Sequence, residues 1–214
     1  MSSSDTKIQE LFALANQSGR SLALQFNFPE LLQEATFTSI AALDQGLLTT
    51  VISASDYLRV ITDTMWDRTS VQKITGPASP SAWQALIANN SAGPPYVFRI
   101  RNRRLYIGPS IIAAGHTIAF EYYSSMWCES SVGAGKTAWS ADADVGRIPE
   151  NILELDLIWR WKQAKGLEYA EDLETAGQAI DTYTGSAGGA RLLILGGANT
   201  FTFPINTAEG SWNL

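Results

Sequence analysis

The stretch from Gly133 to Thr137 has the composition of the end of a phosphate-binding loop. In such a loop two glycines five positions apart let backbone N–H groups surround the phosphates, a lysine reaches the β- and γ-phosphates, and a hydroxyl holds Mg²⁺. Ser130 stands where the first glycine is needed, and a Gly/Ser/Ala loop rather than a helix follows. We therefore expect a flexible or partner-facing loop. The alternative is a nucleotide-using enzyme built on Lys136.

Two aspartates, Asp142 and Asp144, have the spacing of the first ligands of a calcium loop. That pattern also needs an acidic or amide residue at its fifth position and a glutamate at its twelfth, where this chain has Gly146 and Leu153. Aspartates in loops commonly cap turns through their side chains. We therefore expect turn chemistry and no metal site.

Other reactive side chains are few. His116 is the single histidine and Cys128 the single cysteine, and the sequence identifies a partner for neither. The chain also lacks the GxSxG, CxxC and HExxH motifs, which mark common hydrolase, redox and zinc-protease sites. We expect no catalytic residue, no cofactor and no enzymatic activity.

Four arginines lie close together, although the chain is net acidic. They are Arg99, Arg101, Arg103 and Arg104. Alternation of apolar residues on both sides of positions 102–103 predicts a β-hairpin, with these arginines along one strand and at the tip. Two interpretations remain open: a solvated hairpin edge protected by charge, or a contact with an acidic protein surface or nucleic-acid phosphate.

Composition bounds the class of protein. The 214 residues carry a formal net charge of −6, which argues against a surface that binds nucleic acid throughout. A single cysteine forbids an internal disulfide, and no apolar run is long enough for a transmembrane helix. The start lacks the basic and apolar regions of a signal peptide. We expect a soluble, intracellular product with no membrane contact.

Periodicity predicts an α+β fold, namely a helical bundle with a β-rich insertion and an extended C-terminal tail. The expected helices cover about residues 5–17, 29–43, 80–89 and 149–184, and the β-rich layer covers about 48–128. We expect one domain over 1–185 and expect Trp159 to be largely buried.

Residues 186–214 form the expected docking tail, which is rich in glycine yet carries apolar anchors. The anchors are Leu192, Leu193, Ile194, Leu195, Phe201, Phe203 and Trp212. An extended segment of this kind can add to a sheet edge of a partner through main-chain hydrogen bonds.

An ordered set of segments resembles the head-to-tail adaptor proteins of tailed bacteriophages. The most specific segments are Trp66–Thr69, Ser81–Gln84, Trp159–Lys162 and Gly166–Tyr169, and the resemblance covers roughly residues 5–185. It implies a non-enzymatic virion protein of the neck, made in the host cytoplasm, that forms a ring, typically of twelve copies. The ring would join the portal protein to a downstream tail or nozzle protein and let double-stranded DNA pass. Two alternatives remain: a nucleotide-using packaging or tail factor built on the GAGKT stretch that contains Lys136, or a monomeric DNA-binding adaptor.

Overall fold

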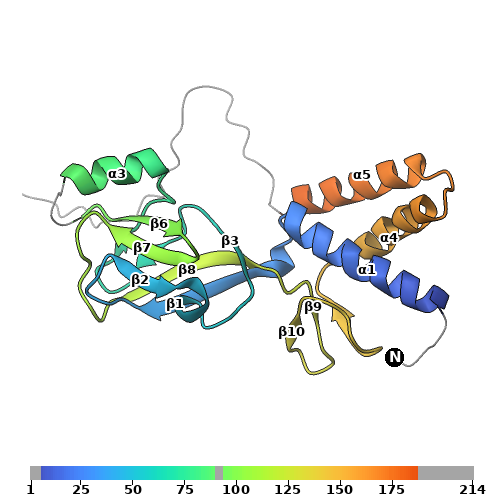
Figure 1. Cartoon of the computed structure of the whole chain (residues 1–214), viewed down its shortest axis with the longest axis horizontal. Coiled ribbons are helices and arrows are strands. Elements are labelled where there is room, and N and C mark those ends of the chain that lie inside the picture. Colours follow the sequence, from blue (N-terminus) through green and yellow to red (C-terminus); the bar gives the residue numbers. More distant parts are fainter. Residues whose placement is uncertain (1–5, 90–93, 188–214) are drawn as a thin grey trace, which may run out of the picture.

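The structure is a computed structural model that describes residues 6–89 and 94–187. Three long helices pack together at one end of an elongated molecule, and a β-rich part with two shorter helices forms the other end (Figure 1). The helices in the described residues are α1 (Thr6–Gln25), α2 (Leu48–Val51), α3 (Pro80–Asn89), α4 (Glu150–Ala164) and α5 (Ala170–Ala187), with a 3₁₀ turn at Pro29–Leu31.

Short strands form three sheets in which every ladder is antiparallel. The strands are β1 (Leu32–Thr38), β2 (Asp44–Leu47), β3 (Tyr57–Val60), β4 (Trp66–Asp67), β5 (Gln72–Lys73), β6 (Val97–Arg101), β7 (Arg104–Gly108), β8 (Thr117–Ser124), β9 (Cys128–Glu129), β10 (Gly135–Lys136) and β11 (Val145–Gly146). The first sheet has the order β1-β8-β4-β5, with β3 also paired to β8. The second has the order β2-β7-β6 and the third β10-β9-β11.

The β-rich part has its own hydrophobic core. Alternate residues of β8, namely Ile118, Phe120 and Tyr122, point into it, as the alternation in the sequence predicted. They meet Phe98, Leu105 and Ile107 from the second sheet, and all six side chains are buried. The two sheets therefore bury one face each against a shared core, which is how antiparallel sheets commonly pack.

A second core lies between the helices and the small third sheet. Leu22, Phe28, Trp127 and Ile152 are among its buried side chains. Helix α4 runs antiparallel to α1, because Ser18 bonds to Asp156 near the middle and Glu10 pairs with Lys165 at one end. None of the described helices is long and apolar enough to cross a membrane.

The predicted helical bundle with a β insertion is wrong: the chain is a mixed, strand-rich structure of five described helices and several antiparallel sheets. Residues 29–43, expected as a helix, instead give the 3₁₀ turn and β1. All seven residues of β1 pair with β8, and Ala35 and Phe37 alternate toward the core. Tertiary pairing thus overrides the helix-like spacing of Leu31, Leu32 and Ala35.

One further expectation about helices was also wrong. The first helix, expected to end at about position 17, continues to Gln25, and Gly19 lies inside it. Trp159 is mostly buried, as expected, with part of its side chain exposed. The Arg160 guanidinium lies over the Trp159 ring at 4.5 Å. The indole N–H of Trp159 donates to Asp156, whose carboxylate is buried.

Candidate interaction surfaces

The predicted arginine hairpin is confirmed as β6 and β7. Its two-residue turn consists of Asn102 and Arg103, both with positive φ (50° and 57°). This is the type I′ geometry that matches the twist of paired strands, and its second position usually carries glycine. The chain accepts an L-residue in the left-handed region here, and the Arg103 side chain is exposed at the tip.

The four arginines have different surroundings. Arg104 donates to Asp44 at 2.6 Å, and this hydrogen bond is the main reason why the pKa of Asp44 lies below its usual range. Arg101 lies over the Tyr106 ring at 5.0 Å. Among the described residues, Arg99, Arg101 and Arg103 have no ion-pair partner. The hairpin therefore presents three arginines without a counter-charge, and Arg104 belongs to the fold.

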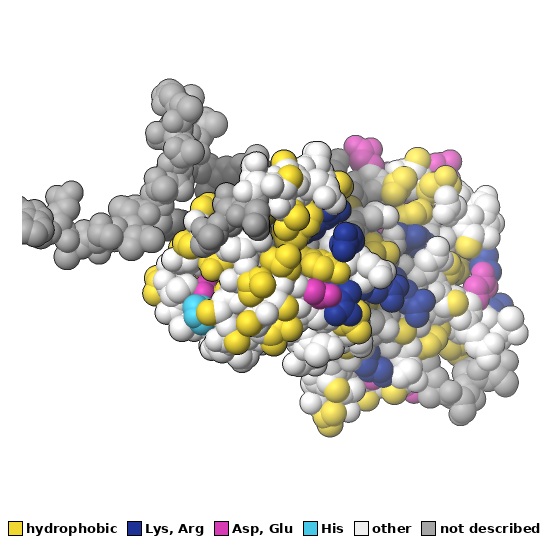
Figure 2. All heavy atoms as spheres, turned by 60° about the vertical axis from the view of Figure 1, so that its left-hand side comes forward, with side chains coloured by type: hydrophobic (Ala, Val, Ile, Leu, Met, Phe, Trp, Pro, Cys, Tyr) yellow, Lys and Arg dark blue, Asp and Glu magenta, His cyan; other side chains and the backbone are white. Residues whose placement is uncertain are grey.

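Positive charge also gathers on a wider surface. Figure 2 shows the β-rich part in front, with Lys and Arg side chains grouped near the centre of the view, on the side of the β-rich part that faces the helical part, and few Asp or Glu side chains among them. The net acidic composition of the chain is therefore unevenly spread over its surface.

Lys136, the lysine of the phosphate-loop-like stretch, is engaged within the protein. It lies in β10, and its ammonium group bonds to Asp144 and to the Ser140 hydroxyl. The two-residue strand β10 pairs with β9, so the stretch is part of a small sheet and not of a strand-to-helix turn. The Gly135–Lys136 pair therefore has a structural role in the small sheet. The Lys136 ammonium group is held by these bonds and is not free to bind a phosphate.

Asp144 fixes the turn that follows. Its carboxylate accepts backbone N–H bonds from Ser140 (2.7 Å) and Ala141 (2.9 Å) in addition to the lysine contact. The hydrogen bond from Lys136 is the main cause that lowers the pKa of Asp144 to about 2. Asp142 is exposed, and the described residues contain no group of acidic, histidine and cysteine side chains that could hold a metal ion.

Acid should therefore loosen this turn. Because the pKa of Asp144 is depressed in the folded state, its contribution to stability is present above the ordinary value of 3.8 and is lost as pH falls through about 2. Asp144→Asn should lower the urea midpoint at pH 7 and flatten the decline between about pH 4 and pH 2. Asp142→Asn is the matched control and should leave the profile unchanged; equal profiles for both variants would contradict the assignment.

His116 and Asp67 organise another turn. His116 Nδ1 lies 2.6 Å from the buried Asp67 carboxylate, which also accepts bonds from the Ser70 hydroxyl and from the N–H groups of Thr69 and Ser70. Burial raises the pKa of Asp67, but these hydrogen bonds outweigh it and the net shift is downward. These contacts hold the loop after β4 against β8. Cys128 is likewise structural: it is buried, and burial raises its pKa to about 11.

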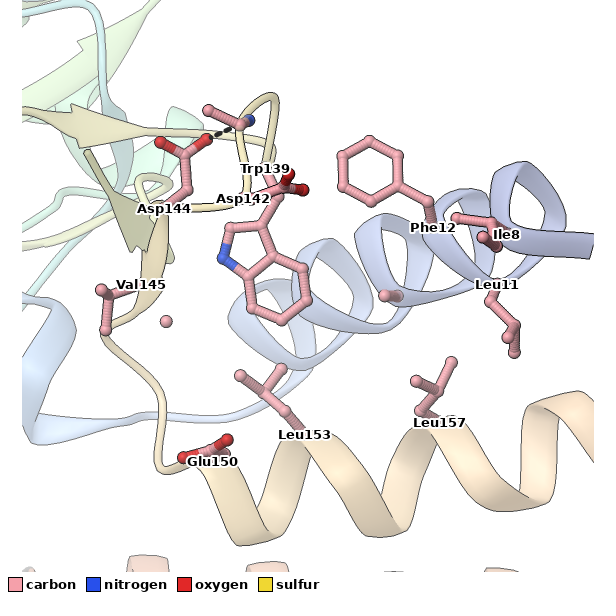
Figure 3. Close-up of a pocket in the computed structure, with 13 residues that line it drawn as sticks. Ile8, Leu11, Phe12, Trp139, Asp142, Asp144, Val145, Glu150, Leu153 and Leu157 are labelled. Atoms are coloured by element: carbon pink, nitrogen blue, oxygen red, sulfur yellow. Dashed lines mark hydrogen bonds between the residues drawn. The ribbon is translucent and has the colours of Figure 1, made fainter. Parts of the chain in front are cut away.

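An apolar groove that no motif predicted lies in the helical part. It has a volume of about 680 Å³ between α1, the loop before β11 and α4 (Figure 3). Ile8, Leu11 and Phe12 line one side and Leu157 the other, and Trp139 points in between them from the loop, toward Leu153. A smaller cavity of about 310 Å³ adjoins it and includes Glu154.

The rim of the groove is acidic. Asp142 and Glu150 line it and Glu154 lines the adjoining cavity; all three are exposed and have no ion-pair partner among the described residues. Among the described residues that line the groove none is a lysine or arginine. The Trp139 indole nitrogen is buried without a hydrogen-bond partner in the described part of the chain. The groove thus combines apolar walls with uncompensated negative charge.

The predicted anchors of the tail lie outside the described residues. This applies to Leu192, Leu193, Ile194, Leu195, Phe201, Phe203 and Trp212. The tail as a docking segment therefore stays a prediction.

Comparison with known proteins identifies the family. The family model described as "SU10 adaptor protein" matches residues 3–200. No curated protein matches the chain. Since the family match covers most of the sequence, in agreement with the resemblance carried by its Trp-rich segments, the chain belongs to the SU10 adaptor protein family, a family of phage adaptor proteins.

Proposed function

We propose that this virion-associated phage adaptor is a structural subunit of the neck. In this proposal copies of the chain form a ring that joins the portal protein to a downstream tail or nozzle protein and lets double-stranded DNA pass. The observation that carries the proposal is the family match over residues 3–200. The part of the chain that the structure describes supports it, since it offers charged and apolar surfaces suited to partners.

The electrostatics suit a channel. If the ring contains twelve copies, as the resemblance implies, the formal charge of −6 per chain gives about −72 in total. DNA must slide past the wall without sticking, so the wall should not be strongly basic. We therefore place the arginine hairpin against protein rather than along the bore.

An enzymatic role receives no support from the loop that suggested it. Lys136 is bonded to Asp144 and Ser140, and a nucleotide would have to displace both. We accordingly propose that the energy for DNA packaging comes from another protein.

Mixing the full chain with the portal protein of the same phage tests the proposal. We expect a complex whose mass corresponds to a closed ring of this chain on the portal, measured by mass photometry and viewed by electron microscopy. The free chain can remain monomeric, because ring closure can require the portal as a template. A chain that stays monomeric with the portal present would contradict the proposal.

The tail should be required for docking on the portal. Among the described residues, the two hydrophobic cores use none after Tyr183. We expect deletion of residues 188–214 to leave the helix content and melting temperature unchanged. We expect the truncated chain to lose binding to the portal, measured by co-sedimentation. Normal binding by the truncated chain would show that the tail serves another partner.

A further inference from the structure

We propose that the tip of the β6–β7 hairpin of one subunit docks into the acidic groove between α1 and α4 of the next subunit. Arg101 and Arg103 would meet Asp142 and Glu150 there. This inference rests on the proposed ring and names its subunit contact.

Charge complementarity is the first support. The hairpin carries Arg99, Arg101 and Arg103 without ion-pair partners, and the groove with its adjoining cavity carries Asp142, Glu150 and Glu154, equally without partners among the described residues. Arg104 of the same hairpin provides an example of such pairing, since it forms an ion pair with Asp44 at 2.6 Å. Guanidinium groups match carboxylates in a fixed two-point geometry, which favours one docking register.

The shape and polarity of the two surfaces also agree. The hairpin ends in a narrow two-residue turn, with the Arg101 guanidinium over the Tyr106 ring. The groove has a volume of about 680 Å³ and is walled by Ile8, Leu11 and Phe12. Apolar stems of arginine side chains can pack along such walls while their heads reach the acidic rim. An interface with an apolar centre and paired charges at its edge is typical of specific protein contacts.

Backbone strain at the tip points the same way. Arg103 has φ of 57°, in the turn position where glycine is preferred. A residue held in the left-handed region is worth a functional explanation when its side chain makes no internal contact. The Arg103 side chain is exposed and has no ion-pair partner among the described residues. Contact with a neighbour supplies the explanation.

The geometry requires a second copy. The hairpin belongs to the β-rich part and the groove to the helical part, which lie at different ends of the molecule (Figure 1). A contact between two different patches is heterologous, and repetition of such a contact closes into a ring when its rotation allows. The hairpin-in-groove contact is therefore of the kind that the proposed function needs.

Charge reversal on each side tests the contact. Arg101→Glu/Arg103→Glu and, separately, Asp142→Lys/Glu150→Lys should each reduce ring formation by the full chain on the portal at least tenfold. A one-to-one mixture of the two variants should restore rings, because each reversed patch then finds its complement on the alternating neighbour. Mass photometry measures both results. Arg68→Glu/Lys73→Glu changes the charge equally at another surface and should assemble as the unmodified chain does.

Several outcomes would overturn the inference. Normal rings from either reversed variant alone would do so, as would a mixture that stays monomeric although circular dichroism shows both variants folded. Rings that form normally while Arg101→Glu/Arg103→Glu loses affinity for duplex DNA would assign the hairpin to nucleic acid instead. If the unmodified chain forms no ring with the portal, the proposed function fails and this inference fails with it.

Arg103→Gly separates assembly from folding. Glycine suits the left-handed turn position, so the melting temperature should equal or exceed that of the unmodified chain. Ring formation should nevertheless fall, since one of the docking guanidinium groups is lost. A purely structural role for Arg103 predicts that melting temperature and assembly move together.

Discussion

Asp156→Ala is expected to lower the free energy of unfolding by about 3–5 kcal/mol. Asp156 is only 4% exposed and lies between α1 and α4. Its carboxylate accepts bonds from the Ser18 hydroxyl (2.5 Å), the Trp159 indole N–H (2.8 Å) and the Arg160 guanidinium (2.6 Å). Removing it leaves a largely buried cation without a counter-charge and two donors without an acceptor, and such losses cost far more than the net value of the pair.

A second ion pair between neighbouring helices provides the control. Lys162 pairs with Asp172 at 2.5 Å, but these side chains are 34% and 26% exposed, so water partly screens them. Asp172→Ala should therefore cost less than about 1 kcal/mol. Urea unfolding followed by circular dichroism measures both variants. Similar losses for the two aspartates would contradict the view that Asp156 anchors α4 to α1.

Gly19→Ala is expected to cost about 3 kcal/mol, at the upper end of the usual range for overpacking. A Cβ atom at position 19 would lie 2.4 Å from two carbons of the Trp127 ring, and that ring is completely buried. The ring cannot swing outward without breaking its indole hydrogen bond to the Thr137 carbonyl. Either α1 must move away from the third sheet or the tryptophan must leave its site.

Gly177→Ala is the control that separates the effect of steric crowding from the effect of helix propensity. Gly177 lies inside α5, and a Cβ atom there would meet nothing within 4 Å. Alanine favours helix over glycine by up to about 1 kcal/mol, so this variant should be more stable than the unmodified chain. Thermal melting measures the stability of both variants. A stabilised Gly19→Ala would show that Trp127 does not pack as described.

Sequence patterns predicted the helices and strands that are determined by their own residues. The β6–β7 hairpin, the buried face of β8 and helix α4 all correspond to clear alternation or helical spacing with stop signals. Residues 29–43 were predicted wrongly, because β1 depends on pairing with β8, which lies about 80 to 90 positions away. The role of Gly19 was equally out of reach, since the tryptophan that needs the space lies on a distant segment.

The candidate surfaces, too, were predictable where a local pattern marks them and were not predictable where distant segments meet. Sequence reasoning found the arginine cluster, because four arginines in an acidic chain are visible without a structure. It could not separate Arg104 from the others, since Asp44 is sixty positions away. The groove combines α1, the loop around Trp139 and α4, whereas the periodicity of the sequence predicted only a helix over about residues 5–17. Both the pairing of Arg104 and the groove depend on contacts between distant segments.

An image of the virion neck tests most directly the proposal that this chain is a ring subunit between portal and tail. We expect a cryo-electron microscopy reconstruction to show closed-ring density beneath the portal into which the β-rich part and the three long helices fit, with DNA or an open channel at its centre. Intact virions whose neck contains no density for this fold would contradict the account.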